Sequence, residues 1–147
     1  MEPSTPPVAD RPAHAPAVPA WLEWKGSGGI LVVDDDDAVR MVLVRALSKI
    51  GFTVSAAAEG TQALAFYDAD PRRYRLVLLD FKLPGMDSKA VLAGIRAKRP
   101  ELPVILMSGY CRQDAAERSS GMPVSDFLHK PFTVDSLASK VRGALGA

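Results

Sequence analysis

The sequence predicts an α/β fold in which helices cover both faces of a doubly wound, five-stranded parallel sheet. Three observations predict it: short apolar runs, amphipathic stretches between them, and five repeats of this pair within residues 30–147. An unbroken apolar run is typical of a parallel strand that is covered on both faces. Parallel neighbours also require a crossover, which is usually a helix.

Five apolar runs are expected to form the strands. The first and third, residues 30–33 and 76–79, contain no polar side chain. The others are residues 52–57, 103–107 and 124–128. Ligands of such sheets bind outside the carboxyl ends of the strands. We therefore expect functional side chains directly after each run.

Apolar residues recur at helical spacing between the runs. The predicted helices lie within residues 39–50, 63–67, 91–95 and 137–145. Gly51 follows the first of them as a C-terminal stop. Residues 111–120 are polar and weakly patterned, so the helix expected there has the least support.

Proline is concentrated at the N-terminus, where six of the 12 prolines lie within the first 19 residues. Such a segment sustains neither a helix nor a central strand. Residues 1–29, which end in a Gly-Ser-Gly-Gly joint, are therefore predicted to be a flexible linker, and residues 30–147 the folded domain. Trp21 and Trp24 interrupt the linker and either pack on the domain or dock a neighbour.

The composition excludes several functions. Eighteen basic against 17 acidic residues give a net charge of +1, which lacks the broad basic surface of nucleic-acid or anionic-membrane binders. The single Cys111 forms no internal disulfide and no Cys/His metal site. No apolar run approaches the roughly 18 residues of a membrane span, and the N-terminus lacks a signal peptide. We expect a soluble, cytoplasmic protein.

Polar residues follow four of the five predicted strands, and parallel topology brings them to one edge of the sheet. They are Asp34, Asp35, Asp36 and Asp37 after the first strand, Asp80 after the third, Ser108 after the fourth and Lys130 after the fifth. Close carboxylates repel one another by ~4 kcal/mol per pair at an effective dielectric near 20. A hard divalent cation neutralises them, and oxygen ligands favour Mg²⁺ over zinc.

The alternative to a metal site is that these aspartates only cap the following helix, and we expect Asp36 or Asp37 to do so. Asp34, Asp35 and Asp80 are instead expected at the ion. Pro131 suits a rigid turn, such as a cis-proline turn, that aims Lys130 back at the carboxylates. A metal, a cation and a hydroxyl around one carboxylate are what phosphoryl transfer needs. Ser108 supplies that hydroxyl, unless it merely caps a helix.

Four stretches, ILVVDDDDAVR, LVLLDFKLPGMDS, VILMSGY and FLHKPF, occur in this order. With them the sequence resembles the receiver domain of two-component response regulators from Ile30 to the C-terminus. The resemblance implies a flavodoxin-like fold with strand order 2-1-3-4-5. It also implies self-phosphorylation and autodephosphorylation chemistry only.

The resemblance assigns roles to the strand-end residues. Asp80 matches the phosphoacceptor, which attacks the phosphorus of a phosphohistidine on a kinase. Asp35 matches the direct Mg²⁺ ligand and Asp34 the acid that holds the ion through water. Lys82 would contribute its backbone carbonyl.

The remaining roles concern the phosphoryl group and the switch. Ser108 would hydrogen-bond the phosphoryl group, and Lys130 would pair with its oxygens. Phe127 matches the switch aromatic, although it lacks a hydroxyl, so that switching would depend on packing; the alternative is a plain core aromatic. Ser88 replaces a glycine common in the family and is expected to alter its loop without touching a charge.

The implied partners are a histidine kinase, in trans or in the same polypeptide, or a phosphotransfer protein, together with a downstream signalling protein. No direct contact of this segment with nucleic acid or membrane is expected. The chain is either a stand-alone receiver or the C-terminal receiver of a hybrid histidine kinase, which the proline-rich tail favours.

A phosphatase of the haloacid dehalogenase type is the alternative function. Asp34-x-Asp36, Ser108 and Lys130 imitate its motif order. That family needs a further acidic pair beyond the lysine, where this chain has only Asp135, and Asp80 would be unexplained.

Overall fold

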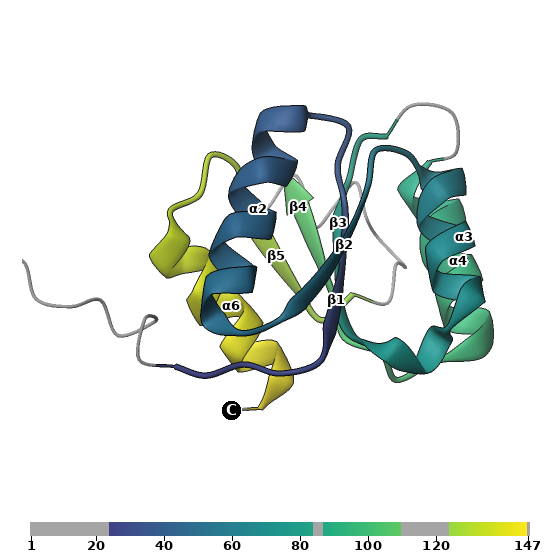
Figure 1. Ribbon diagram of the computed structural model, residues 1–147. Helices are drawn as coiled ribbons and strands as arrows, with labels where there is room; N and C mark the ends of the chain where they lie inside the picture. The colour runs from purple at the N-terminus through teal and green to yellow at the C-terminus, as the bar shows by residue number, and fades with distance from the viewer. Residues whose placement is uncertain (1–23, 84–86, 110–123, 147) are drawn as a thin grey trace, which may run out of the picture.

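The computed structural model describes residues 24–83, 87–109 and 124–146 (Figure 1). Five parallel strands form one sheet in the order β2-β1-β3-β4-β5, which confirms the expected fold and strand order. The strands are β1 (Gly29–Val33), β2 (Thr53–Ala57), β3 (Tyr74–Asp80), β4 (Val104–Ser108) and β5 (Asp126–His129). β3 is longer than its apolar run because Tyr74 also pairs with β1.

Four α-helices lie in the described part of the chain: α2 (Asp37–Ile50), α3 (Gly60–Ala69), α4 (Ser88–Lys98) and α6 (Val134–Leu145). A 3₁₀ turn, Pro71–Arg73, precedes β3. In Figure 1, α2 and α6 cover one face of the sheet, and α3 and α4 cover the other. The weakly predicted helix at residues 111–120 lies outside the described residues.

Alternate side chains of β1 enter two separate cores. Ile30 and Val32 pack with α2 and α6, whereas Leu31 and Val33 pack with α3 and α4. All four side chains are fully buried. A strand covered on both faces has no position for a polar side chain before its end, which is why the apolar run stops at the sheet edge where the site lies.

Both ends of α2 agree with the sequence pattern. The Asp36 carboxylate caps the helix by accepting from the amides of Ala38 at 2.8 Å and Val39 at 3.3 Å. Gly51 ends it with φ 125°, a conformation that favours glycine. A Cβ at Gly51 would also lie 2.5 Å from the carbonyl oxygen of Gly26.

Residues that precede β1 already contact the domain. The Trp24 ring meets Phe52 edge-on, with centroids 5.5 Å apart, and the Arg142 guanidinium lies 5.8 Å from its centroid. The amide of Gly26 donates to the Ile50 carbonyl at 3.0 Å. Trp24 therefore packs on the domain, whereas Trp21 lies outside the described residues. The domain boundary at residue 30 stays a prediction. No helix in the described ranges has both the length and the apolar character needed to cross a bilayer.

Candidate phosphoryl and metal site

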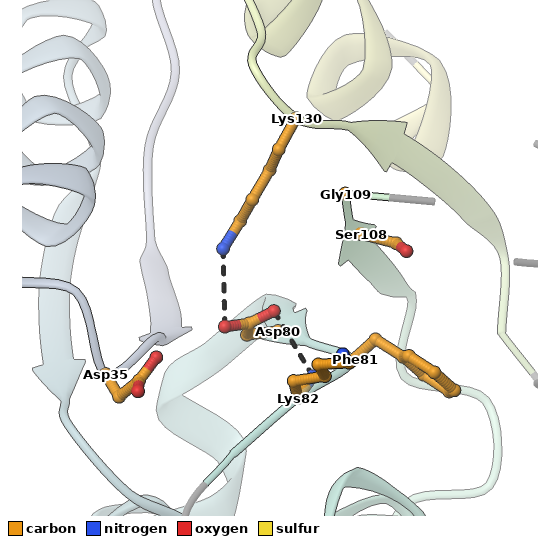
Figure 2. Close-up of a pocket in the computed structure, with 7 residues that line it drawn as sticks. All are labelled: Asp35, Asp80, Phe81, Lys82, Ser108, Gly109 and Lys130. Atoms are coloured by element: carbon orange, nitrogen blue, oxygen red, sulfur yellow. Dashed lines mark hydrogen bonds and ion pairs between the residues drawn. The ribbon is translucent and has the colours of Figure 1, made fainter. Parts of the chain in front are cut away.

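The strand ends bring the predicted residues together at one edge of the sheet. Asp34 follows β1, Asp80 and Ser108 end β3 and β4, and Lys130 follows β5. Asp80, Ser108 and Lys130 line a pocket of about 510 Å³ (Figure 2). Its lining residues are Asp35, Asp80, Phe81, Lys82, Ser108, Gly109 and Lys130.

Both carboxylate oxygens of Asp34 contact other protein groups. It is fully buried, its Oδ2 lies 2.6 Å from Lys130 Nζ, and its Oδ1 accepts from the Asp36 amide at 2.9 Å. Arg40 donates to the Asp34 carbonyl at 2.7 Å and also pairs with Asp37. The first turn of α2 thus fixes the position of Asp34.

Asp80 faces the pocket and is 6% exposed. Its Oδ2 lies 3.3 Å from Lys130 Nζ, and its Oδ1 accepts from the Lys82 amide at 3.3 Å (Figure 2). Burial, and then the charge of Asp34, raise the pKa of Asp80 to about 6, although Lys130 and the Lys82 amide oppose the shift. One lysine therefore does not compensate fully for the charge of the two buried carboxylates.

The lysine reaches these carboxylates from the loop after β5. The backbone amide of Lys130 donates to the Ser108 carbonyl at 2.7 Å, and the peptide bond to Pro131 is cis. Figure 2 shows the side chain extended from this loop toward Asp80. Burial lowers the pKa of Lys130, but the hydrogen bond to Asp34 and the charges of both aspartates outweigh burial, and the net pKa is raised. Lys130 therefore stays charged beside the aspartates.

Three carboxylates are placed to hold a metal ion. One oxygen from each of Asp34, Asp35 and Asp80 lies within 4.8 Å of the others. This oxygen-only set suits Mg²⁺, because small hard cations prefer carboxylate, carbonyl and water ligands. Asp35 is exposed and lines the pocket, while Asp34 uses both oxygens in protein contacts. The separate roles of Asp35 as the direct ligand and Asp34 as the acid that acts through water stay predictions.

The two predicted switch residues lie in different surroundings. Ser108 is 3% exposed and lines the pocket, and in Figure 2 its hydroxyl points away from Asp80. Phe127 is half-buried on β5, pairs in register with Leu106, and packs against the core beneath α3 and α4. The structure therefore brings Ser108 to the site and leaves Phe127 outside the pocket lining.

Sequence reasoning missed other residues of the site. Phe81 and Gly109 line the pocket, and Arg40 fixes the backbone of Asp34. Phe81 and Gly109 directly follow Asp80 and Ser108, so their position after a strand end was a usable signal. Arg40 gave no such signal, because a charged residue on a helix is usually a solvated one.

Residues 30–142 match the family model for the response regulator receiver domain. The chain is 36% identical over 118 residues to the DNA-binding transcriptional regulator NtrC of Salmonella typhimurium, covering 80% of this chain and 25% of that protein. It is 37% identical over 120 residues to the sensor kinase CckA of Brucella abortus, covering 82% of this chain and 13% of CckA.

Solved structures show the same fold. The receiver domain of NtrX from Brucella abortus superposes with a TM-score of 0.71 at 36% identity, covering 80% of this chain and 98% of that one. The chemotaxis protein CheY4 of Vibrio cholerae gives a TM-score of 0.74 at 21% identity, covering 82% of this chain and 100% of CheY4. The chain spans a quarter or less of the full length of NtrC and CckA.

Proposed function

Because this chain belongs to the response regulator receiver domain family, we propose that it accepts a phosphoryl group on Asp80 from a phosphohistidine of a partner protein. The observation that carries the assignment to Asp80 is its position: a buried carboxylate at the end of β3 faces the pocket, between Lys130 and the acidic pair of Asp34 and Asp35. Asp34, by contrast, is fully buried and does not line the pocket.

The transfer needs little covalent chemistry from the protein. One Asp80 oxygen forms the new O–P bond while the N–P bond of the phosphohistidine breaks, and the electron pair returns to the imidazole nitrogen. The Lys82 amide holds Oδ1, and Lys130 lies beside Oδ2. Lys130 thus provides positive charge where the phosphoryl oxygens arrive.

Asp34, Asp35, Asp80 and the backbone carbonyl of Lys82 would hold Mg²⁺, whose charge would neutralise the carboxylates and the phosphoryl oxygens. The Ser108 hydroxyl would turn toward Asp80 and donate to a phosphoryl oxygen. We propose that Phe127, which packs beside this strand, then repacks as the second part of the switch. The signal passed to a downstream protein would be this change in packing.

An apolar groove beside the pocket supports docking of the phosphohistidine partner there. Its volume is about 380 Å³, and Lys130 lines both cavities. The other lining residues, from α2 and the β5–α6 loop, are Ala38, Val39, Val42, Pro131 and Phe132. A histidine kinase or phosphotransfer protein whose apolar helix face fills this groove would bring its histidine near Asp80. Such a partner would place the domain in the cytoplasm.

The haloacid dehalogenase alternative finds no support in the structure or the relatives. Its motif would use Asp34 as nucleophile and Asp36 as the neighbouring acid. Asp34 is fully buried and does not line the pocket, and the Asp36 carboxylate caps α2.

Labelling by a small phosphodonor tests the proposal. We expect wild type incubated with acetyl phosphate and Mg²⁺ to gain one phosphoryl group, seen by intact mass, and to gain none in EDTA. Asp80→Asn should gain none, whereas Asp68→Asn, an exposed aspartate of α3 paired with Lys98, should label like wild type. Wild-type labelling that persists in Asp80→Asn would refute the assignment, and so would a wild type that is never labelled.

A further inference from the structure

Ser88 occupies a position at the start of α4 that the helix does not need for capping. The N-cap is Asp87, whose carboxylate accepts from the Ala90 amide at 2.9 Å. Ser88 is 2% exposed, and its Oγ donates to the Phe81 carbonyl at 2.9 Å. The hydroxyl thus links α4 to the loop that leaves the end of β3.

The Phe81 carbonyl and the Lys82 amide belong to the same peptide group. That group is planar, so its carbonyl and N–H point in opposite directions and turn together. On one side the carbonyl accepts from Ser88, and on the other the N–H donates to Asp80 Oδ1 at 3.3 Å. A single rigid peptide group therefore connects the Ser88 hydroxyl to the Asp80 carboxylate, which is proposed to receive the phosphoryl group.

The backbone before this peptide is already anchored. The Phe81 amide donates to the Met107 carbonyl of β4 at 2.8 Å, which fixes the chain as it leaves β3. The rotation that remains is that of the Phe81–Lys82 peptide, and the Ser88 hydroxyl contacts that peptide from α4. A glycine or alanine at residue 88 would lack the donor.

We infer that Ser88 is a positioning residue for phosphoryl acceptance: it holds the Phe81–Lys82 peptide so that the Lys82 amide stays directed at Asp80. This inference depends on the proposed function for its consequence, a faster transfer. The geometry of the Lys82 amide can be measured without any phosphoryl group. The sequence predicts that Ser88 contacts no charged group. In the structure, its hydroxyl is nevertheless connected to the Asp80 carboxylate through a single peptide group.

The test compares Ser88→Ala, Ser88→Gly and Ser88→Thr in the full chain. Ser55→Ala is the matched control, because Ser55 Oγ accepts from the Tyr74 hydroxyl at 3.0 Å on β2, a half-buried bond with no link to Asp80. Each variant is measured by thermal unfolding, by the NMR chemical shift and hydrogen exchange of the Lys82 amide, and by the rate of acetyl phosphate labelling with saturating Mg²⁺.

We expect Ser88→Ala and Ser88→Gly to shift the Lys82 amide resonance, to speed its exchange, and to slow labelling about fivefold, the effect of one misplaced hydrogen bond. Ser55→Ala should lose stability without either change, and Ser88→Thr should resemble wild type. Wild-type Lys82 signals and rates in both hydroxyl-free variants would overturn the inference. So would Ser88→Thr that unfolds at the wild-type temperature but labels as slowly as Ser88→Ala.

The proposed function can fail separately from this inference. If wild type were never labelled, acceptance by Asp80 would be wrong, while the Lys82 amide signals would still show whether Ser88 holds the peptide. If wild type were labelled and the Lys82 amide were the same in all variants, only the role of Ser88 would be wrong.

Discussion

Lys130 carries the positive charge shared by two buried carboxylates, with its ammonium nitrogen 2.6 Å from Asp34 and 3.3 Å from Asp80. Opposite unit charges about 4 Å apart attract by about 4 kcal/mol at an effective dielectric near 20, and like charges repel equally. Asp35 adds a third negative charge, with a carboxylate oxygen within 4.8 Å of oxygens of Asp34 and Asp80. At the scale of single residues, this group of side chains therefore has fewer positive than negative charges.

The raised pKa of Asp80 predicts how the metal-free protein responds to pH. Asp80 holds its proton more tightly when folded, so its contribution to stability is present below about pH 3.8 and is lost as the pH rises through about 6. Asp80→Asn replaces the carboxyl group by an amide of nearly the same shape, which is neutral at every pH. In EDTA at pH 7.5 we expect this variant to be more stable than wild type by about 2 kcal/mol.

Urea unfolding at pH 4 and pH 7.5 measures this difference. The gap between Asp80→Asn and wild type should nearly close at pH 4. Millimolar Mg²⁺ at pH 7.5 should narrow it by stabilising wild type more than the variant, because the ion binds the folded site. An equal gap at both pH values would contradict the electrostatic account of Asp80.

Replacing Lys130 by methionine keeps the apolar stem and removes the charge. We expect Lys130→Met to lower the free energy of unfolding by about 2 kcal/mol at neutral pH without metal, because two buried carboxylates lose a charged donor. Lys140→Met is the control: Lys140 pairs with Asp126 at a site where both side chains are 32% exposed, and its removal should cost less than about 1 kcal/mol.

A double variant separates charge from packing. Asp80→Asn should stabilise Lys130→Met by more than it stabilises wild type, because the Asp80 charge that it removes has then lost its lysine partner, so the two changes together should cost less than their sum. Strict additivity in urea unfolding would show that Lys130 and Asp80 are not coupled.

At the scale of elements, α2 has one face for the core and another for the groove. Leu43, Leu47 and Ile50 are buried against the sheet. Met41 and Val42 are 53% and 46% exposed, and Val42 lines the groove that shares Lys130 with the acceptor pocket. The N-cap of the same helix is Asp36, whose backbone amide donates to the Asp34 carboxylate and fixes the turn that carries Asp34 and Asp35. α2 thus connects the acidic cluster with the surface proposed to bind the partner.

The exposed face of α2 should affect the rate of phosphoryl transfer from a protein donor but not from a small-molecule donor. We expect Val42→Glu to slow transfer from a phosphorylated histidine kinase or phosphotransfer protein by about tenfold, the cost of burying a charge in an apolar contact. Labelling by acetyl phosphate should stay within about twofold of wild type, because Val42 does not line the acceptor pocket.

Phe66→Glu provides the matched control. Phe66 is also a large exposed hydrophobic side chain, 38% exposed, but it lies on α3 at the other face of the sheet. Its replacement should leave both reactions unchanged. Equal slowing by Val42→Glu and Phe66→Glu would place the docking surface elsewhere.

At the scale of the whole molecule, the chain before β1 joins elements that are distant in sequence. Trp24 contacts Phe52, just before β2, and Arg142 of α6, and the Ser27 carbonyl accepts from Arg75 of β3 at 2.7 Å. A Cβ at Gly26 would lie 2.4 Å from the Phe52 ring, so the close packing there needs glycine. Residues 24–28 therefore contribute to the folded unit even though their composition resembles a joint.

This packing predicts the effect of truncation. We expect a fragment of residues 30–147 to unfold at a lower temperature than one of residues 24–147, and Trp24→Ala to cost about 1–2 kcal/mol through lost apolar and cation–π contact. Arg142→Ala should cost less, because it removes only the cation. Equal melting temperatures for the two fragments would support the boundary at residue 30 instead.

Much of the fold could be predicted because the three central strands, β1, β3 and β4, are buried almost throughout on both faces. The apolar runs at 30–33 and 76–79 fall inside β1 and β3, and Gly51 and Asp36 end and begin α2 as their chemistry requires. Element ends were harder to predict. Tyr74 extends β3 by pairing with β1, and the start of β5 depends on its register with β4 rather than on its own composition.

The sequence by itself determined the strand order, through the family motifs, and the set of strand-end side chains, because parallel strands bring their carboxyl ends to one edge. Only the tertiary structure decided what each group does there: that Lys130 contacts both Asp34 and Asp80, that both Asp34 oxygens contact other protein groups, and that the Ser88 hydroxyl donates to the Phe81 carbonyl. The physical reason is the separation along the chain of the residues that determine each property. Periodicity and motif order reflect local backbone preferences, whereas charge compensation and hydrogen bonding depend on ångström distances between residues far apart in the chain.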